Sequence, residues 1–92
     1  MLMDQSINLE KLAQSFSNED LSAIDFVEKY LSLRRDFLDK KITLSSAAEN
    51  LMENLFWPVE DFEPDPEIFD KADGHIEENE FRNRVRAILI FY

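Results

Sequence analysis

The sequence predicts an all-α protein, a four-helix bundle, and three observations support this prediction. Apolar residues recur every three or four positions in four separate stretches, which is the spacing of amphipathic helices. Two of these stretches begin with a serine that has an acidic residue three positions later, a pattern typical of helix N-termini. The 92 residues include only one glycine and three prolines, too few for the frequent turns of a β protein.

The first two expected helices fill the N-terminal half of the chain. Residues 7–16 carry apolar side chains at helical spacing, and residues 18–21 are expected to form a turn. A longer helix should follow Ser22, which with Asp25 resembles a capping box. We expect this second helix to reach Lys41, because cations suit the negative end of a helix dipole.

A third helix is expected to start at Ser46, which forms a capping box with Glu49. Its apolar stripe consists of Leu51, Leu55, Val59 and Phe62. Pro58 interrupts this stripe, and its ring clashes with the carbonyl group of Asn54 in a regular helix. The third helix should therefore be kinked or broken near Pro58.

Pro64 and Pro66 end the third element, because proline disfavours helical geometry in the residue before it. Residues 65–75 are expected to form a loop with one helical turn around Ile68. The last helix should cover residues 77–91. Its apolar face consists of Phe81, Val85, Ile88, Leu89 and Tyr92.

The chain is expected to form a single domain over residues 1–92, since this length can bury one core. It has no cysteine for disulfides or thiolate metal sites, and no apolar run near the ~20 residues of a membrane span. Its N-terminus lacks the pattern of a secretory signal. We expect a cytoplasmic protein, monomeric when free, without a cofactor and without a membrane partner.

The negative charge is concentrated between Glu60 and Glu80, a stretch here called the acidic segment. The whole chain has a net charge of −10, and this segment holds ten carboxylates against Lys71 alone, a net of −9. Such a field repels nucleic acids and attracts basic proteins. Scattered charges would serve solubility as well, so their concentration favours a binding surface over a merely solvated one. Two prolines also stiffen the segment, which lowers the entropy lost on binding.

Catalytic and metal sites are not expected. The only histidine is His75, and neither a cysteine nor a nucleophile or phosphate-loop motif is present, so an enzyme is not predicted. Gly74 and Glu80 have the spacing of positions six and twelve in an EF-hand loop. Positions one and three would then be Phe69 and Lys71, which cannot bind Ca²⁺.

Some aromatic and basic residues can be interpreted either as core or pairing residues or as partner contacts. Phe62 completes the third apolar stripe and is expected in the core, whereas Trp57 and Phe69 remain open between core and partner contact. Arg34 and Arg35 are expected to pair with carboxylates.

The stretch ENLFWPVEDFEPD, Glu53 to Asp65, resembles the colicin D immunity protein family. The resemblance extends to AIDF at residues 23–26, the pair Arg34-Arg35 and VRAIL at residues 85–89, and covers roughly residues 9–91. It implies a helical bundle that inactivates a nuclease toxin, one that cleaves tRNA, by occupying its basic active-site cleft in place of RNA. The partner would be the basic C-terminal domain of that toxin, bound 1:1.

On this resemblance, Glu60, Glu63 and Asp65 fall on the family's toxin-facing acids, and Arg86 falls on a position in its last helix. Asp61, Glu67 and Asp70 would extend the same field, which completes the predicted toxin-binding set. Pro58 and a longer loop after Asp65 depart from the family pattern. The toxin is therefore expected to differ from colicin D, and could be another tRNA-cleaving bacteriocin or the toxic tip of a contact-dependent growth inhibition system.

Two other readings stay open at this point. An acidic adaptor or nucleic-acid mimic that binds a basic DNA-binding regulator would need the same acidic segment. A piece of a larger assembly with a merely solvated acidic loop would have no tight basic partner.

Overall fold

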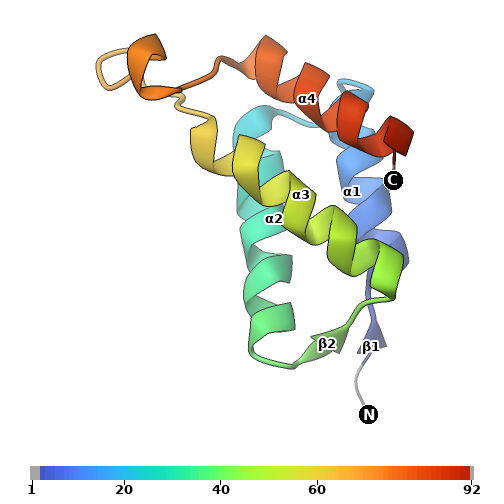
Figure 1. Ribbon diagram of the computed structural model, residues 1–92. Coiled ribbons are helices and arrows are strands. Elements are labelled where there is room, and N and C mark those ends of the chain that lie inside the picture. The colour runs from blue at the N-terminus through green and yellow to red at the C-terminus, as the bar shows by residue number, and fades with distance from the viewer. Residues whose placement is uncertain (1–2, 92) are drawn as a thin grey trace.

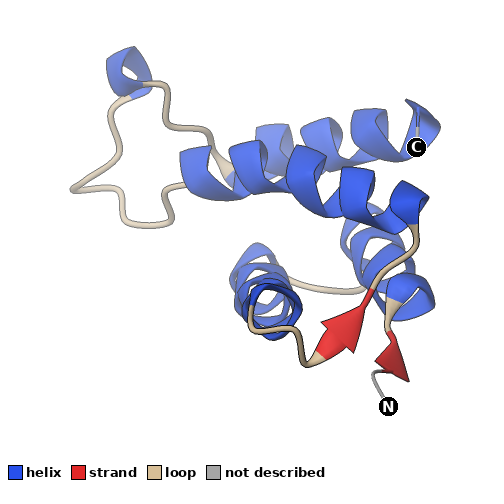
Figure 2. Cartoon of the chain, turned by 60° about the horizontal axis from the view of Figure 1, so that its bottom comes forward, coloured by secondary structure: helices blue, strands red, loops and turns tan. Residues whose placement is uncertain are grey.

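The computed structural model describes residues 3–91, and this part of the chain contains four α-helices (Figure 1). They are α1 (Ser6–Ser17), α2 (Ala23–Leu38), α3 (Ser46–Asp61) and α4 (Glu78–Phe91). Figure 2 shows α3 and α4 side by side in one layer, with α1 and α2 below them. Helix α1 contacts each of the other three helices. The predicted all-α four-helix bundle is confirmed.

The core is built around three phenylalanine rings that contact one another and come from three different helices. Phe16 of α1, Phe26 of α2 and Phe81 of α4 have no exposed surface. The Phe16 ring centroid lies 4.6 Å from that of Phe26 and 4.7 Å from that of Phe81. Phe62 stacks on Phe81 with a centroid distance of 4.9 Å, so its prediction as a core residue is confirmed.

Two short strands add a feature that the sequence did not predict. Strand β1 (Met3–Asp4) pairs in parallel with β2 (Ile42–Thr43), and the Gln5 amide donates to the Thr43 carbonyl oxygen at 3.0 Å. Next to them, the Ser45 amide donates to the Ser6 hydroxyl at 2.8 Å. These contacts tie the start of α3 to the start of α1. Strands of two residues are too short for their alternation to be recognised in a sequence.

The capping predictions are right for α2 and displaced by one residue for α3. The Ser22 hydroxyl accepts the Asp25 amide at 3.2 Å, as expected at the start of α2. Helix α3 begins at Ser46, but the residue that caps it is Ser45, whose hydroxyl accepts the Ala48 amide at 3.2 Å. Two adjacent serines are equally good caps, so the sequence alone does not distinguish them.

Helix α3 continues through Pro58 as far as Asp61, so of the two expected outcomes the break is wrong, and the kink stays a prediction. Proline removes the hydrogen bond to the carbonyl group of Asn54. Asn54 is exposed, so water can replace that bond, and the Pro58 carbonyl still accepts the Phe62 amide at 3.0 Å. Pro58 itself is buried and contributes apolar surface to the last turn of the helix.

Helix α2 ends at Leu38 rather than at Lys41, because the chain turns into left-handed geometry at Lys40, with φ of 60°. The Lys41 amide donates to the Asp36 carbonyl oxygen at 2.8 Å, and the Lys40 amide donates to Phe37 at 3.1 Å. This pattern is a Schellman motif, which normally has glycine at the left-handed position.

Replacing Lys40 with glycine should therefore raise the free energy of unfolding by about 1 kcal/mol, because a residue with Cβ is strained in this conformation. Urea denaturation followed by circular dichroism measures the change. Asp39→Gly is the matched control, since Asp39 has φ of −80° and glycine there only adds entropy to the unfolded chain. Equal destabilisation by both variants would contradict the prediction.

Tyr30 connects α2 to α3 inside the core. Its side chain is fully buried, and its hydroxyl donates to the Met52 carbonyl oxygen at 2.6 Å. Burial raises the pKa of Tyr30 to about 12, because the phenolate would lose its hydration, while the nearby Arg34 acts in the opposite direction.

The stability of the protein should consequently fall between pH 10 and pH 12. In this window the unfolded chain has released the Tyr30 proton and the folded chain still holds it, so rising pH favours unfolding. The expected loss is about 2–3 kcal/mol across the window. Urea denaturation of Tyr30→Phe at a series of pH values should not show this loss of stability. At pH 7 the variant should be about 1 kcal/mol less stable than the wild type, because it lacks the hydrogen bond to Met52. Identical pH dependence of the two proteins would show that Tyr30 titrates normally.

Candidate protein-binding face

The acidic segment spans the end of α3, the following loop and the start of α4. Figure 2 shows the loop extending beyond the layer formed by α3 and α4. The predicted binding residues lie along this path: Glu60 and Asp61 in the last turn of α3, and Glu63, Asp65, Glu67 and Asp70 in the loop. All six side chains are exposed or half-buried. The structure therefore places the set on one continuous stretch of surface chain.

The base of the loop is attached to the core. The Ile76 amide donates to the Asp61 carbonyl oxygen at 2.9 Å, and the Glu63 amide donates to Ile76 at 3.3 Å. This parallel bridge brings the two ends of the loop together. Ile76 is buried and Phe62 stacks on Phe81, so apolar contacts reinforce the bridge. The loop consequently leaves the bundle from a fixed base.

Three of the loop carboxylates stabilise turns of the loop itself. One oxygen of Glu63 accepts the Asp65 amide at 3.0 Å, one of Asp65 accepts the Glu67 amide at 2.9 Å, and one of Asp70 accepts the Ala72 amide at 2.9 Å. Aspartate commonly stabilises turns in this way. Each bond uses one of the two carboxylate oxygens, and the other oxygen can still accept from a partner.

The backbone of the loop forms two tight turns. The Asp65 carbonyl accepts the amides of Ile68 and Phe69 at 3.1 and 2.9 Å, which confirms the helical turn predicted there. A second turn, the 3₁₀ helix η1 (Lys71–Asp73), was not predicted. It ends at Gly74, whose φ of 88° is a conformation that glycine adopts without strain.

Asp61 differs from the other predicted residues because it has a cationic partner within the protein. Arg84 of α4 lies 3.3 Å from the Asp61 carboxylate and 3.2 Å from that of Glu80. All three side chains are well exposed, so each pair contributes at most about 1 kcal/mol to stability. Arg84 nevertheless reduces the negative field at this end of the segment.

Glu60 and Glu67 are the most available carboxylates of the predicted set. Both are exposed, and neither side chain makes a hydrogen bond or an ion pair with another residue in the range 3–91. A partner can therefore bind them without breaking contacts inside the protein.

The structure places the two aromatic residues, Trp57 and Phe69, that the sequence could not assign to the core or to a partner contact. The Trp57 side chain is 67% exposed on α3, one turn before Asp61, so it is not a core residue. Its ring meets the edge of Phe56, over which the Arg34 guanidinium lies at 4.3 Å. Among the described residues Arg34 and Arg35 form no ion pair, so their predicted pairing with carboxylates is wrong. Phe69 is half-buried in the loop.

Arginines of α4 bind the C-terminal end of α1, a role that the sequence did not predict. The Arg82 Nε donates to the Phe16 carbonyl oxygen and the Arg86 Nε donates to that of Ser17, each at 2.8 Å. These carbonyl groups carry the negative end of the helix dipole, and that of Phe16 also accepts the Glu19 amide at 3.1 Å. Arg86, which the family resemblance had indicated, thus supports the packing of α4 on α1.

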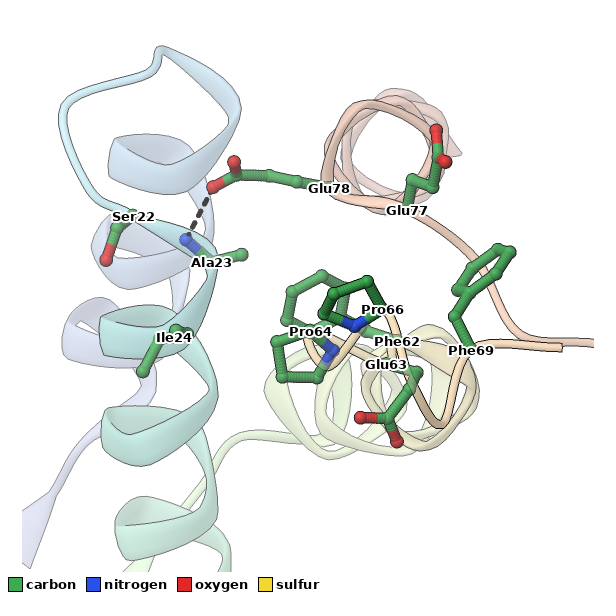
Figure 3. A pocket seen from close by; sticks show the side chains of 10 residues that line it. All are labelled: Ser22, Ala23, Ile24, Phe62, Glu63, Pro64, Pro66, Phe69, Glu77 and Glu78. Atoms are coloured by element: carbon green, nitrogen blue, oxygen red, sulfur yellow. Dashed lines mark hydrogen bonds between the residues drawn. The ribbon is translucent and has the colours of Figure 1, made fainter.

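A cleft of about 490 Å³ lies between the start of α2 and the loop (Figure 3). Ala23 and Ile24 form one side of it, and Phe62, Pro64 and Pro66 form the other. Acidic residues also line it, namely Glu63, Glu77 and Glu78. Glu78 reaches across from α4 and accepts the Ala23 amide at 3.0 Å, which caps α2 from another helix. Residues so far apart in the chain give no sequence signal of their proximity.

Two further observations concern residues 3–91. This part of the chain has no group of three or more histidine or acidic side chains placed to hold a metal ion. None of the described helices is long and apolar enough to cross a membrane.

A family model described as bacterial self-protective colicin-like immunity matches residues 5–90. The chain belongs to this family, which confirms the resemblance found in the sequence. It is accordingly a bacteriocin immunity protein, a class that protects bacteria by binding a cognate toxin. A comparison with curated proteins finds no match.

Proposed function

We propose that this protein inhibits a cognate nuclease toxin, one that cleaves tRNA, by placing the acidic segment in the toxin's basic active-site cleft. The complex would contain one copy of each protein and form in the cytoplasm of the cell that carries both genes. The toxin would arrive either as a bacteriocin or through contact-dependent delivery. The main observation in favour is the concentration of charge, a net of −9 on residues 60–80 of an immunity protein.

In this proposal Glu60, Glu63 and Asp65 make charge-assisted hydrogen bonds to lysine and arginine side chains that otherwise bind RNA phosphates. Asp61, Glu67 and Asp70 extend the negative field around them. The exposed carboxylate oxygens of the loop support this arrangement. The bridged base of the loop supports it as well, because a segment that is ordered before binding loses less entropy on binding.

The same charges would accelerate the encounter. Attraction between an acidic and a basic surface raises association rates well above the ~10⁵–10⁶ M⁻¹s⁻¹ of neutral protein pairs, and added salt reduces this gain. Fast binding matters here because a free nuclease acts catalytically, so each unbound toxin molecule destroys many substrate molecules.

A binding and cleavage experiment tests the proposal. The tagged protein is used to capture the C-terminal domain of the toxin encoded beside its gene, and that domain is assayed for tRNA cleavage with increasing amounts of the protein. Cleavage should stop at a 1:1 ratio. Binding without loss of cleavage would place the contact away from the active site, and absence of binding would overturn the proposal.

A further inference from the structure

We propose that the cleft between α2 and the acidic segment receives one lysine or arginine side chain of the toxin. This inference rests on the proposed function and adds a specific binding site for one side chain, which is called the socket below. The cleft lies beside Glu63, so the acidic segment and the cleft would face the same partner.

The walls of the cleft suit the methylene chain of a long side chain. Ile24 is 54% exposed at the start of α2, although its branched side chain is fully apolar. Pro64 and Pro66 face it across the cleft and are also exposed (Figure 3). Lysine and arginine bury their aliphatic stems on such surfaces and keep the charged group at the rim.

The acidic residues decide which kind of side chain fits. An aliphatic or aromatic side chain would remove water from the carboxylate of Glu63 without giving it a positive partner, which is unfavourable. An acidic side chain would be repelled. A cation at the rim offers donors to the Glu63 carboxylate, whereas Glu78, which extends from α4 on another side of the cleft, keeps its contacts with Ala23 and Arg82.

Glu63 retains an oxygen for that purpose, and Glu78 is already engaged by Ala23 and Arg82. In Glu63, Oε1 accepts the Asp65 amide, and in Glu78, Oε1 accepts from Ala23 and Arg82. Oε2 of each residue takes no part in these bonds. The toxin's cation would therefore complete a partly used set of acceptors and leave the cap of α2 in place.

Ile24→Lys tests the socket, because it puts a cation of the protein where the toxin's cation should bind. Affinity for the toxin's C-terminal domain, measured by titration calorimetry, should fall by about 100-fold or more, as expected for loss of a well-buried anchor. Leu38→Lys is the matched control, since Leu38 is 60% exposed on the same helix at its opposite end. It should change affinity by less than about threefold.

Ile24→Ala separates the apolar wall from charge. It should weaken binding by about tenfold and leave the dependence of affinity on salt concentration as in the wild type, because no charge changes. Thermal unfolding of each variant checks folding, and if Ile24→Lys unfolds at the assay temperature, Ile24→Ala decides the question.

The outcomes distinguish the two proposals. If the wild type binds and inhibits while both Ile24 variants bind as tightly as Leu38→Lys, the socket is overturned and the proposed function stands. If the wild type does not bind the toxin domain, both are overturned. A structure of the complex with an aromatic or aliphatic toxin side chain in the cleft would also overturn the socket.

Discussion

Changing both Glu60 and Glu67 to lysine should weaken binding of the toxin's nuclease domain by at least about 100-fold, because the charge-assisted contact of Glu60 is lost and both positions then repel the basic cleft. The association rate should fall and depend less steeply on salt, because the net charge of residues 60–80 changes from −9 to −5. Stability should change by less than about 0.5 kcal/mol, since both side chains are exposed and neither has a partner within residues 3–91. Stopped-flow binding at several salt concentrations and urea denaturation measure these effects.

The double variant Glu28→Lys and Asp36→Lys is the matched control, because it makes the same change in net charge on α2, outside the acidic segment. It should reduce the association rate only modestly. If the two double variants lose the same affinity, overall charge governs binding and the acidic segment has no special role.

Replacing Phe81 with alanine should lower the free energy of unfolding by about 3–5 kcal/mol, a large part of the 5–15 kcal/mol typical of a domain. Phe81 has no exposed surface, and its ring contacts those of Phe16, Phe26 and Phe62. The substitution would remove the contacts of α4 with Phe16 of α1 and Phe26 of α2, and would also take away the ring on which Phe62 stacks at the base of the loop.

Phe91→Ala is the control on the same helix, because the Phe91 side chain is 88% exposed. It should change stability by less than about 0.5 kcal/mol in urea denaturation. Similar losses in the two variants would contradict the central place of Phe81 in the core.

The helices could be predicted because their signals are local. The apolar stripe that includes Leu51 and Leu55 lies on the buried face of α3, and Ser22 caps α2. The errors also have local causes. Ser45 competes with Ser46 as a cap, and Pro58 is tolerated because the helix hydrogen bond that it removes is the one to the carbonyl group of Asn54, an exposed residue where water can replace it.

The candidate binding face could be predicted only in part. Charge density pointed to residues 60–80, and Glu60 and Glu67 are indeed exposed and free of partners within residues 3–91. Other features depend on contacts between distant parts of the chain. The cleft beside Ile24 and the binding of α1 carbonyl groups by Arg82 arise only when α4 and the loop meet α1 and α2. No local pattern in the sequence records those contacts.

The most direct test of the proposed mechanism is competition with RNA. Fluorescently labelled tRNA is bound to a catalytically inactive toxin domain, and the immunity protein is then added while fluorescence anisotropy is followed. The wild type should displace the RNA at a 1:1 ratio, and the Glu60→Lys and Glu67→Lys double variant should not. A ternary complex, in which the protein binds the toxin and the RNA stays bound, would contradict occupation of the substrate cleft by the acidic segment.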